Sequence, residues 1–204
     1  VDVVGLDTLV HVANGIYENC PNDEAHELFK LPEFVNKMME NKWLGSKTGQ
    51  GFYKKEGKDI LTLDLDTLEY RANKKASFAT LELTKTIEKP IDRFKVLVTG
   101  KDKAGEFYRK NFASMFQYCS NRIPEITDAF YKIDDAMKAG FGWENGPFEI
   151  WDAIGIEKGI ELMKAEGYQP ASWVTDMVAS GNTSFYSIKD GATHFYSITN
   201  KKVE

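Results

Sequence analysis

Three short segments of the sequence carry residues that could bind a substrate or take part in catalysis. Asn121-Arg122 follows an apolar helical stripe, and the amide of Asn121 could donate a hydrogen bond to a substrate carbonyl and stabilise developing negative charge. Trp143 stands in an aromatic and glycine-rich segment, where its ring could contact a ligand. Residues 45–51 form a glycine-rich loop around Lys47, a composition that can cradle a phosphate.

Each of these segments also has a structural interpretation, which the sequence context favours. An asparagine at a helix end is commonly satisfied by local backbone groups, and most tryptophans of this kind pack in a core. A serine precedes Lys47, and a predicted helix precedes the loop, so the P-loop pattern is not met. Lys54 stands where the dinucleotide fingerprint requires glycine. Residues 45–51 therefore predict a tight turn that leads Phe52 and Tyr53 into the core.

Metal binding and nucleophilic catalysis have no local support in the sequence. The three histidines are scattered, and Cys20 and Cys119 each lack a nearby second ligand, so no metal site is predicted. The Gly-x-Ser-x-Gly pattern of an acyl-transfer nucleophile does not occur. Acidic pairs such as Asp134-Asp135 are predicted to form a solvated helix face.

The overall composition argues against several classes of partner. The chain has 204 residues and a formal net charge of -5, so no basic surface for nucleic acid or an anionic membrane is predicted. No apolar run approaches the roughly 20 residues that span a bilayer. Hydrophobic residues make up 42% of the chain, which is enough to build a core. Two cysteines are too few for a disulfide framework, and this predicts a cytoplasmic location.

Helices are predicted for most of the chain, so the predicted fold class is mainly α with short β-hairpins. Apolar residues recur at helical spacing over residues 3–18, and Pro32 and Pro90 suit the first turns of helices. Asp102 is the predicted N-cap of a long helix that ends or kinks at Pro124. Further helices are predicted over 133–138, 147–164 and 171–179, and hairpins over 60–70 and 184–199, the second turning at Asp190-Gly191.

An internal repeat is the most informative feature of the sequence. Asp2-x-x-Gly5-Leu6-Asp7 matches Asp152-x-x-Gly155-Ile156-Glu157. Phe34-Val35-x-x-Met38-Met39 matches Trp173-Val174-x-x-Met177-Val178, and Phe52-Tyr53 matches Phe185-Tyr186, each pair being followed by a predicted hairpin. The spacing between matched segments shrinks along the chain, so the second copy is the shorter one.

The repeat predicts how the chain is organised. About 50 residues of predicted helix precede Asp152, whereas a single residue precedes Asp2. We therefore expect the first copy to lack its front half and the chain to be an excised fragment. The predicted parts are the second half of a first unit over 1–57, a hairpin, linker and connecting helices over 58–97, and a complete second unit over 98–204. Either the two units share one core, or helices within 79–99 fill the gap.

Four segments together resemble the C-terminal domain of 3-hydroxyacyl-CoA dehydrogenases. Residues 44–53 (Leu-Gly-Ser-Lys-Thr-Gly-Gln-Gly-Phe-Tyr) are similar to its closing signature, and residues 146–155 (Gly-Pro-Phe-Glu-Ile-Trp-Asp-Ala-Ile-Gly) to the signature in its middle. Residues 121–125 resemble the Asn-Arg region of its first long helix, and residues 133–142 resemble the stretch in between. Larger bacterial β-oxidation proteins of this family carry two such domains in tandem, which accounts for the repeat.

The resemblance implies a fold, an activity and a set of partners. The implied fold is the helical domain of the 6-phosphogluconate-dehydrogenase C-terminal type. The implied parent protein oxidises 3-hydroxyacyl-CoA to 3-ketoacyl-CoA with NAD, so its partners are an acyl-CoA and its own Rossmann domain. That domain and the family's His–Glu pair are missing here, so no cofactor is expected to bind this fragment. Asn121 matches the family's asparagine that assists the substrate carbonyl, but it lies in the second copy, which resembles a scaffold that replaces a partner subunit.

Two functions stay open at the level of the sequence. The chain is a substrate-side and dimerisation scaffold of such a dehydrogenase, inactive alone, or it is a non-enzymatic helical packing or subunit-interaction module. A cleft lined by both Asn121 and Trp143 favours substrate contact, whereas burial of these side chains against another helix favours the scaffold. In either case an exposed apolar surface near residues 3–18 predicts self-association.

Overall fold

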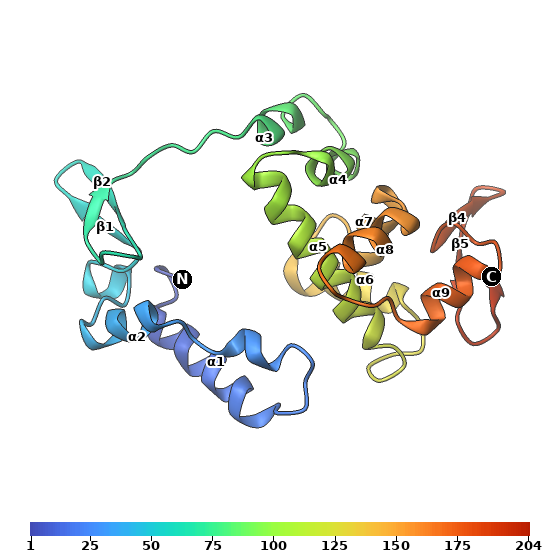
Figure 1. The fold of residues 1–204 in the computed structure, drawn as a ribbon, viewed down its shortest axis with the longest axis horizontal. Coiled ribbons are helices and arrows are strands. Elements are labelled where there is room, and N and C mark those ends of the chain that lie inside the picture. The colour runs from blue at the N-terminus through green and yellow to red at the C-terminus, as the bar shows by residue number, and fades with distance from the viewer. The chain divides into compact units, whose positions relative to one another are not determined.

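The computed structural model describes all 204 residues, which divide into two compact units, Val1–Ala76 and Ser77–Glu204. Figure 1 shows the order of the elements along the chain. Each unit has its own apolar core. The predicted boundaries at residues 57 and 97 separate copies of the sequence repeat rather than compact units, and they stay predictions.

Unit 1 packs two helices and a small antiparallel sheet around one core. Its elements are α1 (Leu6–Asn19), the 3-10 helix η1 (His26–Phe29), α2 (Glu33–Glu40), the 3-10 helix η2 (Ser46–Thr48), β1 (Tyr53–Glu56), β2 (Asp59–Leu63) and β3 (Tyr70–Ala72). The strands pair in the order β1-β2-β3. Leu6 of α1, Val35 and Met38 of α2 and Leu63 of β2 are buried together, so both helices use their apolar faces against the sheet.

Unit 2 is a helical bundle followed by a second small sheet (Figure 1). Its elements are α3 (Ala79–Thr84), α4 (Pro90–Thr99), α5 (Lys103–Asn121), α6 (Tyr131–Phe141), α7 (Pro147–Ile154), α8 (Ile156–Ala165), α9 (Ser172–Ala179), β4 (Tyr186–Lys189), β5 (Ala192–Ser197) and β6 (Lys202–Val203). Helices α3 and α4 belong to this unit, where α4 packs on α5 and α7. The predicted mainly helical fold is confirmed.

Aromatic side chains fill the core of unit 2. The rings of Phe116 on α5 and Trp151 on α7 are stacked with centroids 4.7 Å apart. Phe148 and Phe130 lie edge-on or tilted against Phe185, which immediately precedes β4, at centroid distances of 5.1 and 5.3 Å. These offset and edge contacts add to the burial of the rings. The core therefore joins the bundle to the sheet of this unit.

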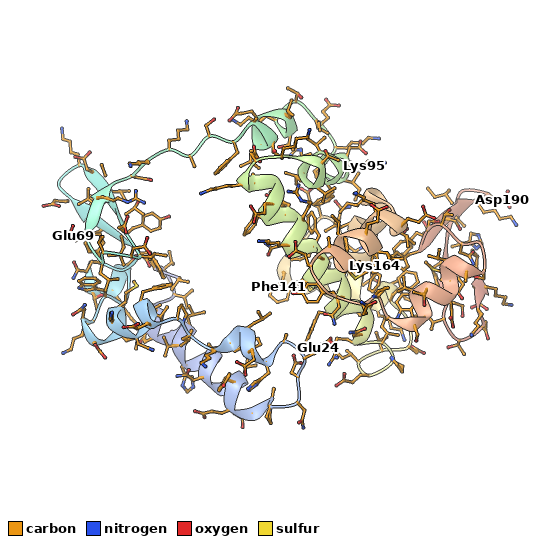
Figure 2. All side chains as sticks on the ribbon, in the orientation of Figure 1. Glu24, Glu69, Lys95, Phe141, Lys164 and Asp190 are labelled. Carbon is orange, nitrogen blue, oxygen red and sulfur yellow. The ribbon has the colours of Figure 1, made fainter.

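Several predicted element boundaries are confirmed. Helix α4 begins at Pro90, and Asp102 caps α5 by accepting a hydrogen bond from the Gly105 N–H at 3.0 Å. Asp102 also accepts bonds from the Thr80 N–H and hydroxyl at 2.9 and 2.7 Å. The backbone bonds from Thr80 and Gly105 lower the pKa of Asp102 to about 2. The β4–β5 hairpin turns at Asp190, labelled in Figure 2.

Glycines with positive φ explain where two other helix predictions are wrong. The first helix begins at Leu6 rather than residue 3, because Gly5 has φ +111° and leaves Val3 and Val4 outside it. The single helix predicted over 147–164 is two helices, because Gly155 has φ +103° and breaks the chain between α7 and α8. Strand β1, which pairs with β2, was not predicted from the sequence.

No helix is long and apolar enough to cross a membrane.

A glycine on α8 gives a test of the packing in unit 2. A Cβ at Gly159 would collide with the indole of Trp151, whose Nε1–H donates to the Ile156 carbonyl at 3.1 Å. We expect Gly159→Ala to lower the unfolding free energy by about 1–3 kcal/mol through overpacking. Gly140→Ala on α6 is the matched control, because its Cβ meets open space and should stabilise the helix by up to about 1 kcal/mol. Thermal melting that moves in the same direction for both variants would contradict this packing.

Candidate functional site

A buried carboxylate organises residues 141–152, the aromatic and glycine-rich segment that contains Trp143. Asp134 on α6 is fully buried, and its oxygens accept hydrogen bonds from the N–H groups of Phe148 and Glu149 at 2.9 and 3.1 Å. The hydroxyl of Tyr186 donates a third bond at 2.8 Å. Asp134 therefore caps the first turn of α7 from another helix. The prediction of a solvated face for Asp134 is wrong, although Asp135 is exposed.

The Gly-Pro-Phe-Glu start of α7 is shaped to receive this carboxylate. A Cβ at Gly146 would collide with Asp134, so only glycine allows the close approach. Pro147 takes the first helical position, where no N–H is needed. The Glu149 carboxylate accepts from the Gly146 N–H at 2.8 Å and pairs with Lys138 of α6 at 2.8 Å. Every residue of this short motif thus contributes to the junction between α6 and α7.

A second carboxylate contact occurs in both units. Asp152 at the end of α7 accepts hydrogen bonds from the N–H groups of Phe185 and Tyr186, both at 2.8 Å. In unit 1, Asp2 accepts bonds from the N–H groups of Phe52 and Tyr53 at 3.0 and 2.8 Å. We call each of these contacts, between an aspartate and a Phe-Tyr pair, a carboxylate clamp.

The residues around the two clamps also adopt the same backbone conformation. Gly5 and Gly155, each three residues after the clamp aspartate, have φ, ψ angles of 111°, 136° and 103°, 132°. The Gly5 N–H donates to the Val1 carbonyl, and the Gly155 N–H to the Trp151 carbonyl. The repeat seen in the sequence is therefore present in the structure at the level of single hydrogen bonds.

Burial sets the protonation of the acidic groups in unit 2. Desolvation raises the pKa of Asp134 to about 6, because the three bonds it accepts offset only part of the cost of burying the charge. Desolvation likewise raises the pKa of Asp152 to about 6. Burial and the charge of Asp134 raise the pKa of the Tyr186 hydroxyl, so this group stays a donor.

Asn121, the candidate for substrate contact, is the last residue of α5 and is half-buried. Next to it, the Arg122 guanidinium pairs with Glu125 at 2.8 Å, and the Trp173 Nε1–H donates to the Ser120 carbonyl at 3.0 Å. A largely apolar groove of about 780 Å³ lies along this end of α5 and α6. Its lining includes Arg122 but not Asn121.

Trp143 lines a different pocket of unit 2. This pocket has a volume of about 330 Å³ and lies between α4, α5 and the loop before α7, with Phe94, Tyr108 and Met115 in its wall. Asn121 is six residues beyond Met115, which corresponds to about 9 Å along the helix. Neither pocket is therefore lined by both Asn121 and Trp143. Neither of these two pockets is the single cleft, lined by both residues, that direct substrate contact predicts.

The glycine-rich loop of unit 1 is a closed turn. The N–H groups of Ser46, Thr48 and Gly49 donate to backbone carbonyls of Asp2, Gly45 and Ser46, so they are not directed at a ligand. The side chain of Lys47 pairs with Asp7, whose Oδ2 lies 2.6 Å away. This donor set does not fit the pyrophosphate of a dinucleotide.

The prediction that Phe52 and Tyr53 both enter the core is only half right. Phe52 packs against the core of unit 1, but Tyr53 is exposed. A Cβ at Gly51 would collide with the Asp2 carboxylate and the Gly45 backbone, so this glycine is needed for a close approach. The structure holds no group of three or more His, Cys, Asp or Glu side chains arranged around a metal.

Comparison with known proteins shows which family the chain belongs to. The family model "3-hydroxyacyl-CoA dehydrogenase, C-terminal domain" matches residues 1–55 and 112–191. The chain belongs to this 3-hydroxyacyl-CoA dehydrogenase C-terminal domain family. One matched stretch lies in each unit, and each contains a clamp aspartate of the family domain.

The curated relatives are much longer than this chain. A probable 3-hydroxyacyl-CoA dehydrogenase of Bacillus subtilis (strain 168) is 43% identical over 196 residues, which cover 96% of this chain and 25% of the relative. A fatty acid oxidation complex subunit alpha of Psychrobacter cryohalolentis is 30% identical over 200 residues, covering 92% and 24%. A putative fatty acid oxidation complex trifunctional enzyme of Rickettsia felis is 27% identical over 154 residues, covering 73% and 20%. The chain spans 25% or less of each relative's length.

Sequence reasoning missed the roles of the three aspartates. Asp2 and Asp152 were visible as repeat partners, each preceding a glycine by three residues and a Phe-Tyr pair by a longer interval. The matching positions of the two aspartates in the repeat were the signal that each one contacts its own Phe-Tyr pair. Asp134 gave no such signal, because an Asp-Asp pair on a helix is equally compatible with solvent.

The raised pKa of Asp134 predicts a pH-dependent stability. The pKa of the carboxyl is near its ordinary value of 3.8 in the unfolded chain and about 6 in the folded one, so the folded state binds the extra proton between these values. The stabilising contribution of Asp134 is therefore complete below pH 4 and falls by up to about 3 kcal/mol as the pH rises past 6.

Denaturant unfolding of the wild type and Asp134→Asn at pH 4 to 7.5 measures this effect. The difference in unfolding free energy between them should shrink with rising pH. In Tyr186→Phe the loss of stability should extend to higher pH, because the hydroxyl group that stabilises the charged Asp134 carboxylate is gone. Parallel pH profiles for the wild type and Asp134→Asn would show that burial of this carboxyl is not linked to folding.

Proposed function

We propose that this chain is the C-terminal, substrate-side and dimerisation scaffold of an NAD-dependent 3-hydroxyacyl-CoA dehydrogenase. The whole protein would oxidise a 3-hydroxyacyl-CoA to the 3-ketoacyl-CoA, with hydride transfer taking place on a Rossmann domain outside this sequence. The observation that carries the proposal is the pair of family-model matches, one in each unit, each with its carboxylate clamp. A cytoplasmic location is part of the proposal and is supported by two free cysteines.

The interior of unit 2 supports a scaffold role. The buried carboxylate of Asp134 caps a helix, the half-buried carboxylate of Asp152 holds the start of a strand, and the aromatic rings form one packed core. A rigid core of this kind can hold a neighbouring domain in place without taking part in proton or hydride transfer. The residues present do not form a dinucleotide cradle, so no step of the reaction is assigned to them.

The first prediction of the proposal is that this chain alone is inactive. We expect no NADH, followed by its absorbance, when the chain is mixed with NAD and 3-hydroxybutyryl-CoA, because hydride transfer needs a cofactor site. NADH formation that increases with protein concentration and is lost in Asn121→Ala would overturn the proposal.

The alternative, a non-enzymatic packing or subunit-interaction module, is favoured by the separation of Asn121 from the Trp143 pocket. Calorimetric titration with 3-hydroxybutyryl-CoA distinguishes the two functions. A substrate-side scaffold should bind it in a saturable way, and Asn121→Ala should weaken the binding about tenfold, or about 1.4 kcal/mol. Absence of binding by both proteins would leave the packing module as the function.

A further prediction concerns association of the chain with itself. Val3, Val4, Leu9 and Val12 at and near the start of α1 are exposed, and apolar surface of this kind favours association. Sedimentation should show a concentration-dependent shift above the monomer mass, and Val12→Asp should reduce it. The control is Leu28→Asp, which changes an equally apolar and exposed residue on η1. Strictly monomeric sedimentation of the wild type at high concentration would contradict this expectation.

A further inference from the structure

The β4–β5 hairpin is attached to the helices of unit 2 by a small number of contacts. Figure 1 shows the two strands at one end of this unit, where they make few close backbone approaches to its helices. The ring of Phe185 is buried in the aromatic core, and Phe195 of β5 contacts the ring of Tyr131 at 4.5 Å. Ile188, further along β4, is 82% exposed. The attachment therefore depends on these rings and on the hydrogen bonds of Phe185 and Tyr186.

Two carboxylates from different helices meet at Tyr186. Its N–H donates to Asp152 of α7, and its hydroxyl donates to Asp134 of α6, both at 2.8 Å. Asp152 also accepts a hydrogen bond from the Phe185 N–H. Asp134 is buried and Asp152 is half-buried. A single residue of the hairpin thus bridges two acidic groups that are both largely removed from water.

The charged groups around this pair do not neutralise it. The Lys138 ammonium of α6 pairs with Glu149 at 2.8 Å and with Asp135 at 3.6 Å, rather than with Asp134. No basic side chain forms an ion pair with Asp152. The negative charge of Glu149 on α7 also acts on Asp134 and disfavours its ionisation. Two negative charges in this place would therefore face each other without a cation between them.

The other titratable groups that face the pair stay neutral. Helix α5 presents Cys119, and burial together with the charge of Asp134 raises the pKa of its thiol to about 12. Strand β4 presents the Tyr186 hydroxyl, whose pKa burial and Asp134 also raise. Burial, with a smaller contribution from the charge of Asp134, raises the pKa of Asp152 to about 6. Because each carboxyl affects the other, the two titrate as a coupled pair.

We propose that Asp134, Asp152 and Tyr186 form a pH-sensitive latch that holds the β4–β5 hairpin on the helices of unit 2. While the carboxyl pair keeps a proton, the surrounding N–H and O–H donors accommodate the single negative charge and the latch is closed. When this proton leaves to solvent, two partly desolvated negative charges repel each other across Tyr186. Opening of the start of β4 then lets water reach both carboxylates.

The direction of the effect follows from linkage between proton binding and opening. The pKa of each carboxyl is about 6 in the closed latch and moves toward the ordinary value of 3.8 once water reaches it. Opening therefore releases protons, so the latch is tightest at low pH and loosens as the pH rises through about 6. The inference concerns this cluster and not dehydrogenase activity, so it and the proposed function can fail separately.

The carboxylate clamp of unit 1 provides an internal reference in the same molecule. Asp2 accepts hydrogen bonds from the N–H groups of Phe52 and Tyr53, as Asp152 does from its own pair. The Tyr53 side chain is 51% exposed and does not meet a second carboxylate. The two clamps thus share their backbone contacts and differ in the second buried acid.

Hydrogen exchange of the full chain between pH 5 and 7.5 tests the latch. After division by the intrinsic pH dependence of exchange, the amides of Phe185 and Tyr186 should exchange at least about tenfold faster at pH 7.5 than at pH 5. The amides of Phe52 and Tyr53 should change by less than about twofold, because no second buried acid acts on them. Equal pH dependence at the two clamps would overturn the proposal.

Low concentrations of urea distinguish opening of the latch from unfolding of the whole unit. Local opening exposes little surface, so exchange at Phe185 and Tyr186 should depend weakly on urea, whereas exchange in the middle of α5 should depend on it steeply. The same steep dependence at both places would show that the hairpin is released only when unit 2 unfolds, and the latch would be rejected.

A matched pair of variants on α6 tests the coupling of the two charges. Asp134→Asn removes the buried charge, whereas Asp135→Asn makes the same change at the exposed neighbouring residue. In Asp134→Asn, the Asp152 carboxyl should titrate at lower pH than in the wild type, as followed by the NMR shift of its carboxyl carbon. The pH dependence of exchange at Tyr186 should also become smaller.

The Asp135→Asn control should leave the Asp152 titration and the exchange of the hairpin as they are in the wild type. An Asp152 titration that is the same in all three proteins would overturn the proposal, since the two carboxyls would then be independent. The pH series on the wild type needs no substitution, so it decides the proposal even where Asp134→Asn does not fold.

Discussion

The paired backbone N–H groups that precede each sheet must find an acceptor, and in both units one aspartate accepts them both. A backbone donor left without a partner away from water costs about as much as a lost hydrogen bond. The N–H groups of Phe52, Phe185 and Tyr186 lie at part-buried sites, so Asp2 and Asp152 supply acceptors that water would not reach as readily. Each aspartate lies three residues before a glycine with positive φ, from which the next helix starts. The clamp therefore ties the chain just before the next helix to the start of the sheet in each unit.

In unit 2 the consequences can be followed from one contact to the next. Asp152 holds the N–H of Tyr186, and the ring then places its hydroxyl on Asp134. Asp134 in turn satisfies the first turn of α7, the helix on which Asp152 itself lies. Three groups that are expensive to bury thus support one another in a closed circuit. The family signature at residues 146–155 is the part of this circuit that is visible as a motif, whereas the signature at 44–53 ends in the Phe-Tyr pair of the clamp in unit 1.

Local rules predicted the elements whose signals lie in adjacent residues. Pro90, Asp102 and Asp190-Gly191 each act on their own turn of chain, so α4, the cap of α5 and the last hairpin could be predicted from them. The helix predicted over 147–164 runs through Gly155, because a φ of +103° beside the clamp aspartate leaves no trace in the apolar periodicity. The burial of Asp134 depends on Phe148 and Tyr186, which are remote in sequence. Contacts between residues that are remote in sequence produce no periodic pattern in the sequence that could reveal them.

The repeat that aligns Asp152 with Asp2 also aligns Trp151 with Val1 and Gly159 with Leu9, and this reciprocal change in side-chain size bears on how a polypeptide with two similar units folds. Neighbouring domains of related sequence can pair their halves wrongly during synthesis. Trp151 against Leu9 would overfill the contact, and Val1 against Gly159 would leave a void, so both wrong pairings are penalised. One reciprocal change in side-chain size thus gives each copy its own identity and disfavours an exchange of parts between two related units of one chain.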